Sequence, residues 1–247
     1  MTGWNLSIMT TTNFPKILTD FFSEKHPSFN KEIKIEKNVF STNLPIIELN
    51  LNLDTAKILA DLKDFVHETP INRQLPYETV PRVRGWGVTD LWLNVSTTKY
   101  PYLMDLYYKK YYNGDLLPAI PKDENKYPNI VKQLNNINID RCRASVITAG
   151  GYLYPHRDIS LNPTPMNYMW IPLNNPVGSE LGVYPVGKIP TKLGYGYLLN
   201  QENYVHAVIN NSSSTRHVLV CYLSDEQPSA FVDLVTQSIK QQYKVIQ

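Results

Sequence analysis

The sequence has little cysteine, no long apolar run and almost no net charge. Each of these absences argues against a class of protein. Two cysteines, Cys142 and Cys221, are too few for a disulfide framework. Because each lies in an apolar, strand-like run, we expect both to be buried free thiols. No stretch approaches the ~20 apolar residues of a membrane helix. The first 16 residues lack the basic start and apolar core of a signal peptide. We therefore expect a soluble, cytoplasmic protein.

The charge balance also argues against two kinds of partner. The chain has 24 basic and 22 acidic residues, for a formal net charge of +2. A balance this even gives no reason to expect nucleic-acid binding or a polybasic membrane patch. With 247 residues and 43% apolar content, the chain can bury one sizeable core.

From residue 139 onward, short runs of Val, Ile, Leu and Tyr alternate with Gly, Pro and Asn breaks. Strands are predicted over 141–149, 152–156, 167–173, 181–186, 194–199, 204–210 and 215–223. Several short strands separated by turn residues indicate a sandwich or barrel. A closing helix is predicted to start near Pro228 and to cover an outer sheet face.

The first half of the chain is expected to be partly helical. A half-buried strand is predicted within 44–53, followed by a helix capped by Asp54. Further helices are predicted over 102–112 and from Pro128. Between them, the tryptophans and arginines of 82–93 either shape a substrate entrance or pack a strand against helices. We divide the chain into an N-terminal region (1–138), a β core (139–225) and a C-terminal helix (226–247), within one structural domain.

Three residues of the predicted β core have the composition of a metal site. On an extended backbone, His156 and Asp158 point to one side, with Arg157 on the other. His206 follows in a later apolar strand. Two histidines and one carboxylate form the facial triad that binds Fe(II) in non-heme oxygenases. Each residue alone has a simpler interpretation, because Asp158 can pair within a surface turn and His206 can be a satisfied core residue.

Arg216 lies on the strand that returns from His206 across a tight turn. An arginine inside a barrel needs an anionic partner, and its planar fork suits a carboxylate. The alternative is an exposed ion pair at the start of a strand. A dicarboxylate cosubstrate would account for Arg216 and the metal site together.

These residues, in order, resemble a known family. The pattern comprises Arg143-Ala144-Ser145, Ala149-Gly150-Gly151, His156-Arg157-Asp158, Ile171-Pro172-Leu173, His206, Asn210-Asn211-Ser212 and Arg216. It resembles the aspartyl/asparaginyl β-hydroxylase family of 2-oxoglutarate- and Fe(II)-dependent oxygenases, which includes free-proline hydroxylases. The resemblance covers roughly residues 139 to 224.

The resemblance implies a mainly β fold, a double-stranded β-helix (a jelly-roll barrel of the cupin type) with flanking helices. It implies that His156, Asp158 and His206 bind iron and that Arg216 grips the distal carboxylate of 2-oxoglutarate. Ser145 would assist at the same carboxylate. Arg143 shares the strand face of Ser145 by alternation and is a further candidate for contacting cosubstrate or substrate.

The implied activity is a dioxygenase that uses Fe(II), 2-oxoglutarate and O2 to hydroxylate an unactivated C–H bond. The expected substrate is an amino acid, free or within a peptide. Two alternatives remain: a metal-binding module without turnover, and a metal cupin oxygenase that does not use 2-oxoglutarate. One departure from the family concerns the strand before Ile171, which in relatives carries an arginine or histidine. Here it reads Asn167-Tyr168-Met169-Trp170, so Asn167 or Tyr168 would have to replace that contact.

Overall fold

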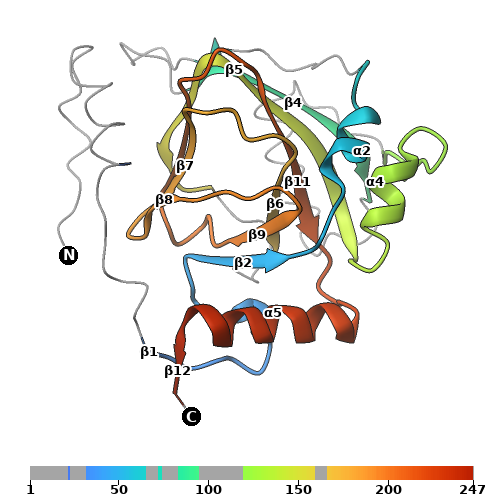
Figure 1. Cartoon of the computed structure of the whole chain (residues 1–247). Coiled ribbons are helices and arrows are strands. Elements are labelled where there is room, and N and C mark those ends of the chain that lie inside the picture. Colours follow the sequence, from blue (N-terminus) through green and yellow to red (C-terminus); the bar gives the residue numbers. More distant parts are fainter. Residues whose placement is uncertain are drawn as a thin grey trace.

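The computed structural model describes residues 22, 32–64, 72–73, 83–94, 119–158 and 166–246. Within these residues the protein is mainly β, with few helices outside a curled sheet (Figure 1). The strands are β1 (Glu32–Ile33), β2 (Ile46–Asn50), β3 (Asn72–Arg73), β4 (Val83–Leu93), β5 (Ile139–His156), β6 (Tyr168–Pro172), β7 (Ser179–Val183), β8 (Gly187–Ile189), β9 (Tyr195–Leu199), β10 (His206–Asn210), β11 (Arg216–Leu223) and β12 (Lys244–Val245). The helices are η2 (Val39–Ser41), α2 (Thr55–Ala60), α4 (Pro128–Gln133) and α5 (Ser229–Gln242). The helix predicted over 102–112 lies outside the described residues.

The strand order identifies the barrel. The main sheet runs β2-β9-β6-β11-β5-β10-β7-β8, and every neighbouring pair is antiparallel. The first part of β5 pairs with β11 and its last part pairs with β10. One layer therefore contains β9, β6 and β11, the other contains β10, β7 and β8, and β5 belongs to both. This is a double-stranded β-helix, the fold that the family resemblance implied.

β5 corrects the prediction of separate strands over 141–149 and 152–156, because it is continuous over 18 residues. Gly150 has a φ of +70°, a conformation that glycine adopts without steric cost. The chain turns there from one layer into the other, while β4 keeps pairing with β5 on both sides of the turn. The glycines that predicted a break therefore make a corner within one strand.

Replacing Gly151 by alanine is expected to lower the free energy of unfolding by about 1–3 kcal/mol, as overpacking does. A Cβ at this position would lie 2.7 Å from the backbone oxygen of Arg84 and 2.8 Å from that of Thr148. Urea denaturation measures the loss. Gly196→Ala is the matched control, because its Cβ would meet only the side-chain ends of Leu51 and Met169, which can move. Equal losses in the two variants would contradict a backbone origin of the effect.

β4 was predicted only as one of two alternatives for 82–93, and β8 was not predicted. β4 extends over 11 residues and pairs with β5 from Val83 to Leu93, which supports the interpretation of 82–93 as a packed strand. Its alternation is interrupted by polar residues, including Asp90. β8 has three residues and pairs only with β7 among the described strands. It is too short to give a periodic signal.

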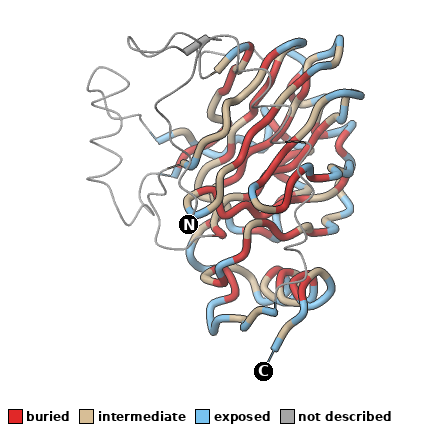
Figure 2. Tube along the Cα trace, turned by 90° about the vertical axis from the view of Figure 1, so that its left-hand side faces the viewer, coloured by how far each residue is buried: buried red, intermediate tan, exposed pale blue. Residues whose placement is uncertain are grey.

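Alternating side chains divide the apolar residues into two cores. Along β11, Val218 and Val220 belong to the core inside the barrel. Leu219 and Cys221 belong to a larger core between the outer face of the sheet and the helices. Figure 2 shows that the buried residues are concentrated in the layered strands. Residues of β11 with the parity of Val218 therefore face the barrel interior, and Arg216 is one of them.

The C-terminal helix begins at Ser229, as predicted from the sequence, and α5 lies along the outer side of the sheet beneath β2 (Figure 1). Its buried face includes Phe231, Val235 and Ile239. At its end, the Tyr243 hydroxyl donates a 2.5 Å hydrogen bond to the carbonyl oxygen of Ile46 in β2. The helix covers apolar surface that would otherwise face water, so its contribution is to stability.

Both cysteines are buried and free, as predicted. Cys142 and Cys221 face each other across β5 and β11 with their sulfur atoms 3.9 Å apart. Burial and the neighbouring thiol Cys221 raise the pKa of Cys142 well above its ordinary value, so this thiol is an inert part of the outer core.

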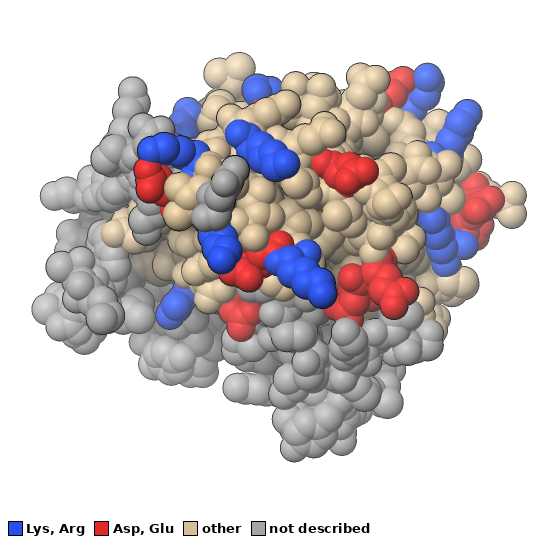
Figure 3. Space-filling model, turned by 90° about the horizontal axis from the view of Figure 1, so that it is seen from below, with Lys and Arg blue, Asp and Glu red and all other residues tan. Residues whose placement is uncertain are grey.

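The described surface mixes charges of both signs. Seen from below in Figure 3, lysines and arginines are interspersed with aspartates and glutamates. Among the described helices, none combines the length and apolarity required to cross a membrane.

Candidate metal centre

The three predicted ligands meet where β5 and β10 lie side by side. His156 is the last residue of β5 and His206 is the first of β10, and the two occupy paired positions in the antiparallel ladder. Asp158 follows β5 by two residues, and its backbone N–H donates to the carbonyl oxygen of Gln201 at 3.0 Å. Strand pairing therefore brings together residues that are far apart in the sequence.

The distances suit one shared cation. Nε2 of His156 lies 3.3 Å from one carboxylate oxygen of Asp158, and Nε2 of His206 lies 3.9 Å from the other. Donor atoms from the three residues all lie within 4.8 Å of one another. Metal–ligand bonds of roughly 2.0–2.2 Å need donors at about this spacing. The donor set of two imidazoles and one carboxylate on one side therefore fits a divalent transition metal with open positions opposite.

The histidine rings are oriented for metal binding. Nδ1 of His156 is 2.5 Å from the carbonyl oxygen of Tyr154, which can only accept a hydrogen bond, so Nδ1 is the donor and Nε2 is the ring nitrogen directed at the site. His206 is only 7% exposed. Burial, reinforced by the charge of His156, lowers the pKa of His206 to about 4. His206 can therefore present a neutral ring nitrogen at neutral pH.

Asp158 is the anionic member of the set. Burial opposes its ionisation, but the hydrogen bond with His156 and the charges of His206, His156 and Arg143 together lower its pKa. The carboxylate is therefore ionised at neutral pH, as a metal ligand must be.

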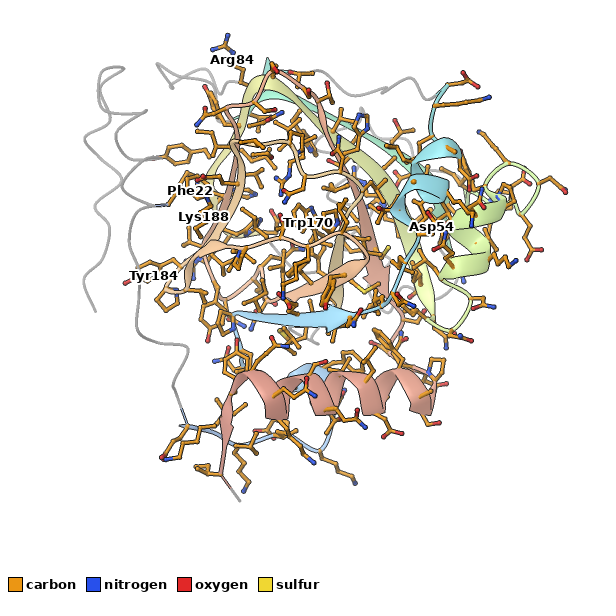
Figure 4. All side chains as sticks on the ribbon, viewed as in Figure 1. Phe22, Asp54, Arg84, Trp170, Tyr184 and Lys188 are labelled. Carbon is orange, nitrogen blue, oxygen red and sulfur yellow. The ribbon has the colours of Figure 1, made fainter. Side chains whose placement is uncertain are left out.

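Arg216 lies inside the barrel and is only 2% exposed. Its guanidinium stacks over the ring of Trp170 at 4.3 Å from the centroid (Trp170 is labelled at the centre of Figure 4). No salt bridge joins it to any acidic side chain in the described part of the chain. Burial lowers its pKa to about 9. A buried cation without a carboxylate partner is a position at which an anionic ligand would be stabilised.

Ser145 faces the barrel interior, as Arg216 does. Arg216 pairs with Ile147 of β5, and Ser145 is the next inward-facing residue of that strand. Its hydroxyl oxygen accepts a 3.0 Å hydrogen bond from the indole nitrogen of Trp86. The hydroxyl hydrogen therefore remains available for an acceptor in the barrel. Trp86 itself, one of the tryptophans of 82–93, supports the serine as a side-chain partner.

Arg143 also faces inward, but an acidic residue lies beside it. Its Nε is 3.4 Å from a carboxylate oxygen of Asp90. The same carboxylate accepts two hydrogen bonds from Arg141 at 2.6 and 2.8 Å. Asp90 and Arg141 were not among the residues predicted from the sequence. The available signal was a carboxylate within the largely apolar run from Val88 to Leu93.

The comparisons with known proteins give structural neighbours only. No family model and no curated protein matches the sequence. A 2OG-Fe(II) oxygenase family oxidoreductase from Burkholderia pseudomallei is similar with a TM-score of 0.45 and 15% identity, over 75% of this chain and 87% of that one. A Trichoplax adhaerens prolyl hydroxylase, solved with a hypoxia-inducible factor peptide fragment, has a TM-score of 0.42 and 16% identity, over 88% and 94% of the chains. A Pseudomonas putida prolyl-4-hydroxylase has a TM-score of 0.39 and 16% identity, over 74% and 94%.

The fold and the site together describe a jelly-roll protein with a candidate facial-triad metal centre. The narrower resemblance to the aspartyl/asparaginyl β-hydroxylase family remains a prediction.

Proposed function

We propose that the protein is a 2-oxoglutarate- and Fe(II)-dependent dioxygenase that hydroxylates an unactivated C–H bond. The observation that supports this best is the combination of His156, Asp158 and His206 with a buried Arg216 inside the same barrel. The triad supplies three ligands for Fe(II), and Arg216 supplies a buried positive charge for the far end of a dicarboxylate. A metal site alone would leave Arg216 unexplained.

Each residue then has a defined task. His156, Asp158 and His206 would hold Fe(II). Arg216 would bind the distal carboxylate of 2-oxoglutarate through its planar fork, and Ser145 would add a hydroxyl donor. Bound together, Fe(II), 2-oxoglutarate and O2 supply an oxidant strong enough to hydroxylate an unactivated C–H bond.

The barrel interior provides the surroundings that such chemistry needs. The inward rings of Trp170 and Tyr197 pack edge to face at 6.0 Å, next to the Arg216 guanidinium. These large side chains exclude water from around the charge, which strengthens its attraction for a carboxylate. The substrate class that we favour is an amino acid, free or within a peptide.

Two other functions would use the same metal ligands. A metal-binding module without turnover, or a cupin oxygenase that does not use 2-oxoglutarate, needs no buried arginine for a second carboxylate. Retaining an unpaired buried guanidinium is costly. The position of Arg216 therefore favours the 2-oxoglutarate-dependent enzyme over both.

Visible absorption under anaerobic conditions tests the proposal directly. Adding 2-oxoglutarate to the Fe(II)-loaded protein is expected to produce a charge-transfer band in the green region of the spectrum. Such a band requires the keto-acid end of the cosubstrate on the iron. Succinate, which lacks the keto group, serves as the control and is expected to give no band. Absence of a band with 2-oxoglutarate would exclude the proposed cosubstrate.

A further inference from the structure

A second charged cluster lies on the inner face of the sheet, apart from the residues assigned to iron and 2-oxoglutarate. It consists of Asp90 in β4 with Arg141 and Arg143 in β5, and the three side chains are only 12%, 11% and 14% exposed. Two guanidiniums share one carboxylate, so the cluster has one positive charge in excess. Largely buried charge needs a compensating partner.

The charge in excess belongs to Arg143. Arg141 has the bidentate hydrogen bonds to Asp90 and also lies over the Tyr222 ring at 5.5 Å from its centroid. In contrast, Nε of Arg143 is buried and makes no hydrogen bond, because the 3.4 Å approach to Asp90 lacks the required geometry. Asp90 is its only salt-bridge partner among the described residues. The guanidinium of Arg143 is thus available to another anion.

That anion is not the carboxylate assigned to Arg216. Arg216 pairs with Ile147 and Val220 pairs with Arg143, so the two arginines are four residues apart along the strands. At about 3.3 Å per residue, their backbone positions lie roughly 13 Å apart along the strand direction. Their guanidiniums also point to opposite sides of the β5–β11 pair, because Arg143 approaches Asp90 in β4 whereas Arg216 lies over Trp170 in β6. Arg143 therefore marks an anion position separate from that of Arg216.

Two tyrosines line the same region. Tyr222 pairs with Arg141 in β5 and with Tyr168 in β6. The rings of Tyr222 and Tyr168 pack edge to face, with their centroids 5.3 Å apart. Burial raises the pKa of Tyr168 well above its ordinary value, so its hydroxyl stays protonated. In the described part of the chain this hydroxyl has no hydrogen-bond partner, which leaves it as a donor.

The metal centre is close to this region. Leu153 and Tyr204, which precede His156 and His206 by three and two residues, pack against the core inside the barrel. The two tyrosines that line the cluster also pack against this core. The cluster, the tyrosines and the metal ligands therefore share one interior.

We propose that this region is the substrate subsite and that the substrate is a carboxylic acid, whose carboxylate is bound by Arg143 with help from the Tyr168 hydroxyl. The inference rests on the proposed function. With Fe(II), Asp158, 2-oxoglutarate and Arg216 in place, the formal charges of the centre cancel. The excess positive charge of the cluster then remains, and a substrate carboxylate neutralises it. An amino acid with a free carboxylate fits this requirement, and its carboxamide does not.

The test compares free L-amino acids with their carboxamides on the full chain supplied with Fe(II), 2-oxoglutarate and O2. Succinate release above the substrate-free rate is measured, and melting temperatures are measured with Mn(II) and 2-oxoglutarate. At least one acid is expected to stimulate release and raise the melting temperature, and its carboxamide to show about tenfold or more lower kcat/KM. Arg143→Gln should raise the KM for that acid by about 30-fold or more, with the KM for 2-oxoglutarate unchanged.

Three variants make the result specific. Arg143→Gln is expected to fold, because Asp90 keeps both hydrogen bonds from Arg141. Tyr168→Phe removes only the hydroxyl and should give a smaller rise in KM for the acid. Arg84→Gln is the matched control, since Arg84 is an exposed arginine that points away from the barrel (labelled in Figure 4), and it should leave both KM values unchanged.

Several outcomes would overturn the inference: a carboxamide as effective as its acid, a rise in the KM for 2-oxoglutarate in Arg143→Gln, or no acid that acts in either assay. Failure of the proposed function looks different, because the wild type would then convert no 2-oxoglutarate at all. In that event the melting temperatures still decide, since an acid must stabilise the wild type and not Arg143→Gln.

Discussion

Replacing His206 by alanine is expected to abolish Fe(II)-dependent turnover of 2-oxoglutarate, with a loss of at least about 100-fold. His206 provides the ligand from β10, whereas His156 and Asp158 both come from the end of β5. Without it, the metal would have two protein ligands on one chain segment. Metal affinity, measured by calorimetry with Mn(II) in place of Fe(II), should fall together with succinate release.

His217→Ala is the matched control for this prediction. His217 lies in β11, next to Arg216, on the opposite face of the strand, and burial lowers its pKa as it does that of His206. The substitution should therefore cost some stability while leaving metal affinity and turnover unchanged. Full activity in His206→Ala, or equal loss in both variants, would contradict the assignment of His206 as a ligand.

The parts of the fold that local pattern determines could be predicted from the sequence. Alternating Val, Ile and Leu gave the strands of the barrel, and the apolar face of 229–242 gave the closing helix. The candidate ligands could be selected from the sequence, because His156 and Asp158 have the spacing of one strand face. Placing His206 beside them depends on strand pairing, and only the order of motifs in the resembling family indicated it.

The rest depends on contacts between distant residues. Asp90 looks like an interruption of a strand until Arg141 and Arg143 are brought alongside it by the pairing of β4 with β5. The role of Gly150 as a corner rather than a break likewise depends on β4. The separation of the Arg143 and Arg216 guanidiniums also depends on the pairing that places β4 and β6 on opposite sides of β5 and β11.

Replacing Arg216 by glutamine is expected to change affinity and stability in opposite directions. The KM for 2-oxoglutarate should rise by about 30-fold or more, because the distal carboxylate loses its only buried guanidinium. Metal affinity should stay near the wild-type value, since the three ligands are untouched. The ligand-free protein, however, should be no less stable than the wild type.

The stability half of this prediction follows from the surroundings of Arg216. Removing one member of a buried ion pair leaves an uncompensated charge, but Arg216 has no carboxylate partner among the described residues, so its removal leaves none. Burial already disfavours its charged form, as its pKa of about 9 indicates. The loss is limited to the contact with Trp170, worth roughly 2 kcal/mol at most. Removing an unpaired buried charge offsets that loss.

Thermal melting and calorimetry distinguish the effect on 2-oxoglutarate affinity from the effect on stability. Ligand-free Arg216→Gln should melt at or above the wild-type temperature, while 2-oxoglutarate, added with Mn(II), should stabilise the wild type far more than the variant. Arg216→Lys keeps a positive charge but not the planar fork. Its affinity for 2-oxoglutarate should therefore lie between that of the wild type and that of Arg216→Gln. Arg84→Gln should behave as the wild type in both measurements. Unchanged 2-oxoglutarate affinity in Arg216→Gln would show that the cosubstrate carboxylate binds elsewhere, and a large drop in melting temperature would show that Arg216 is a structural residue.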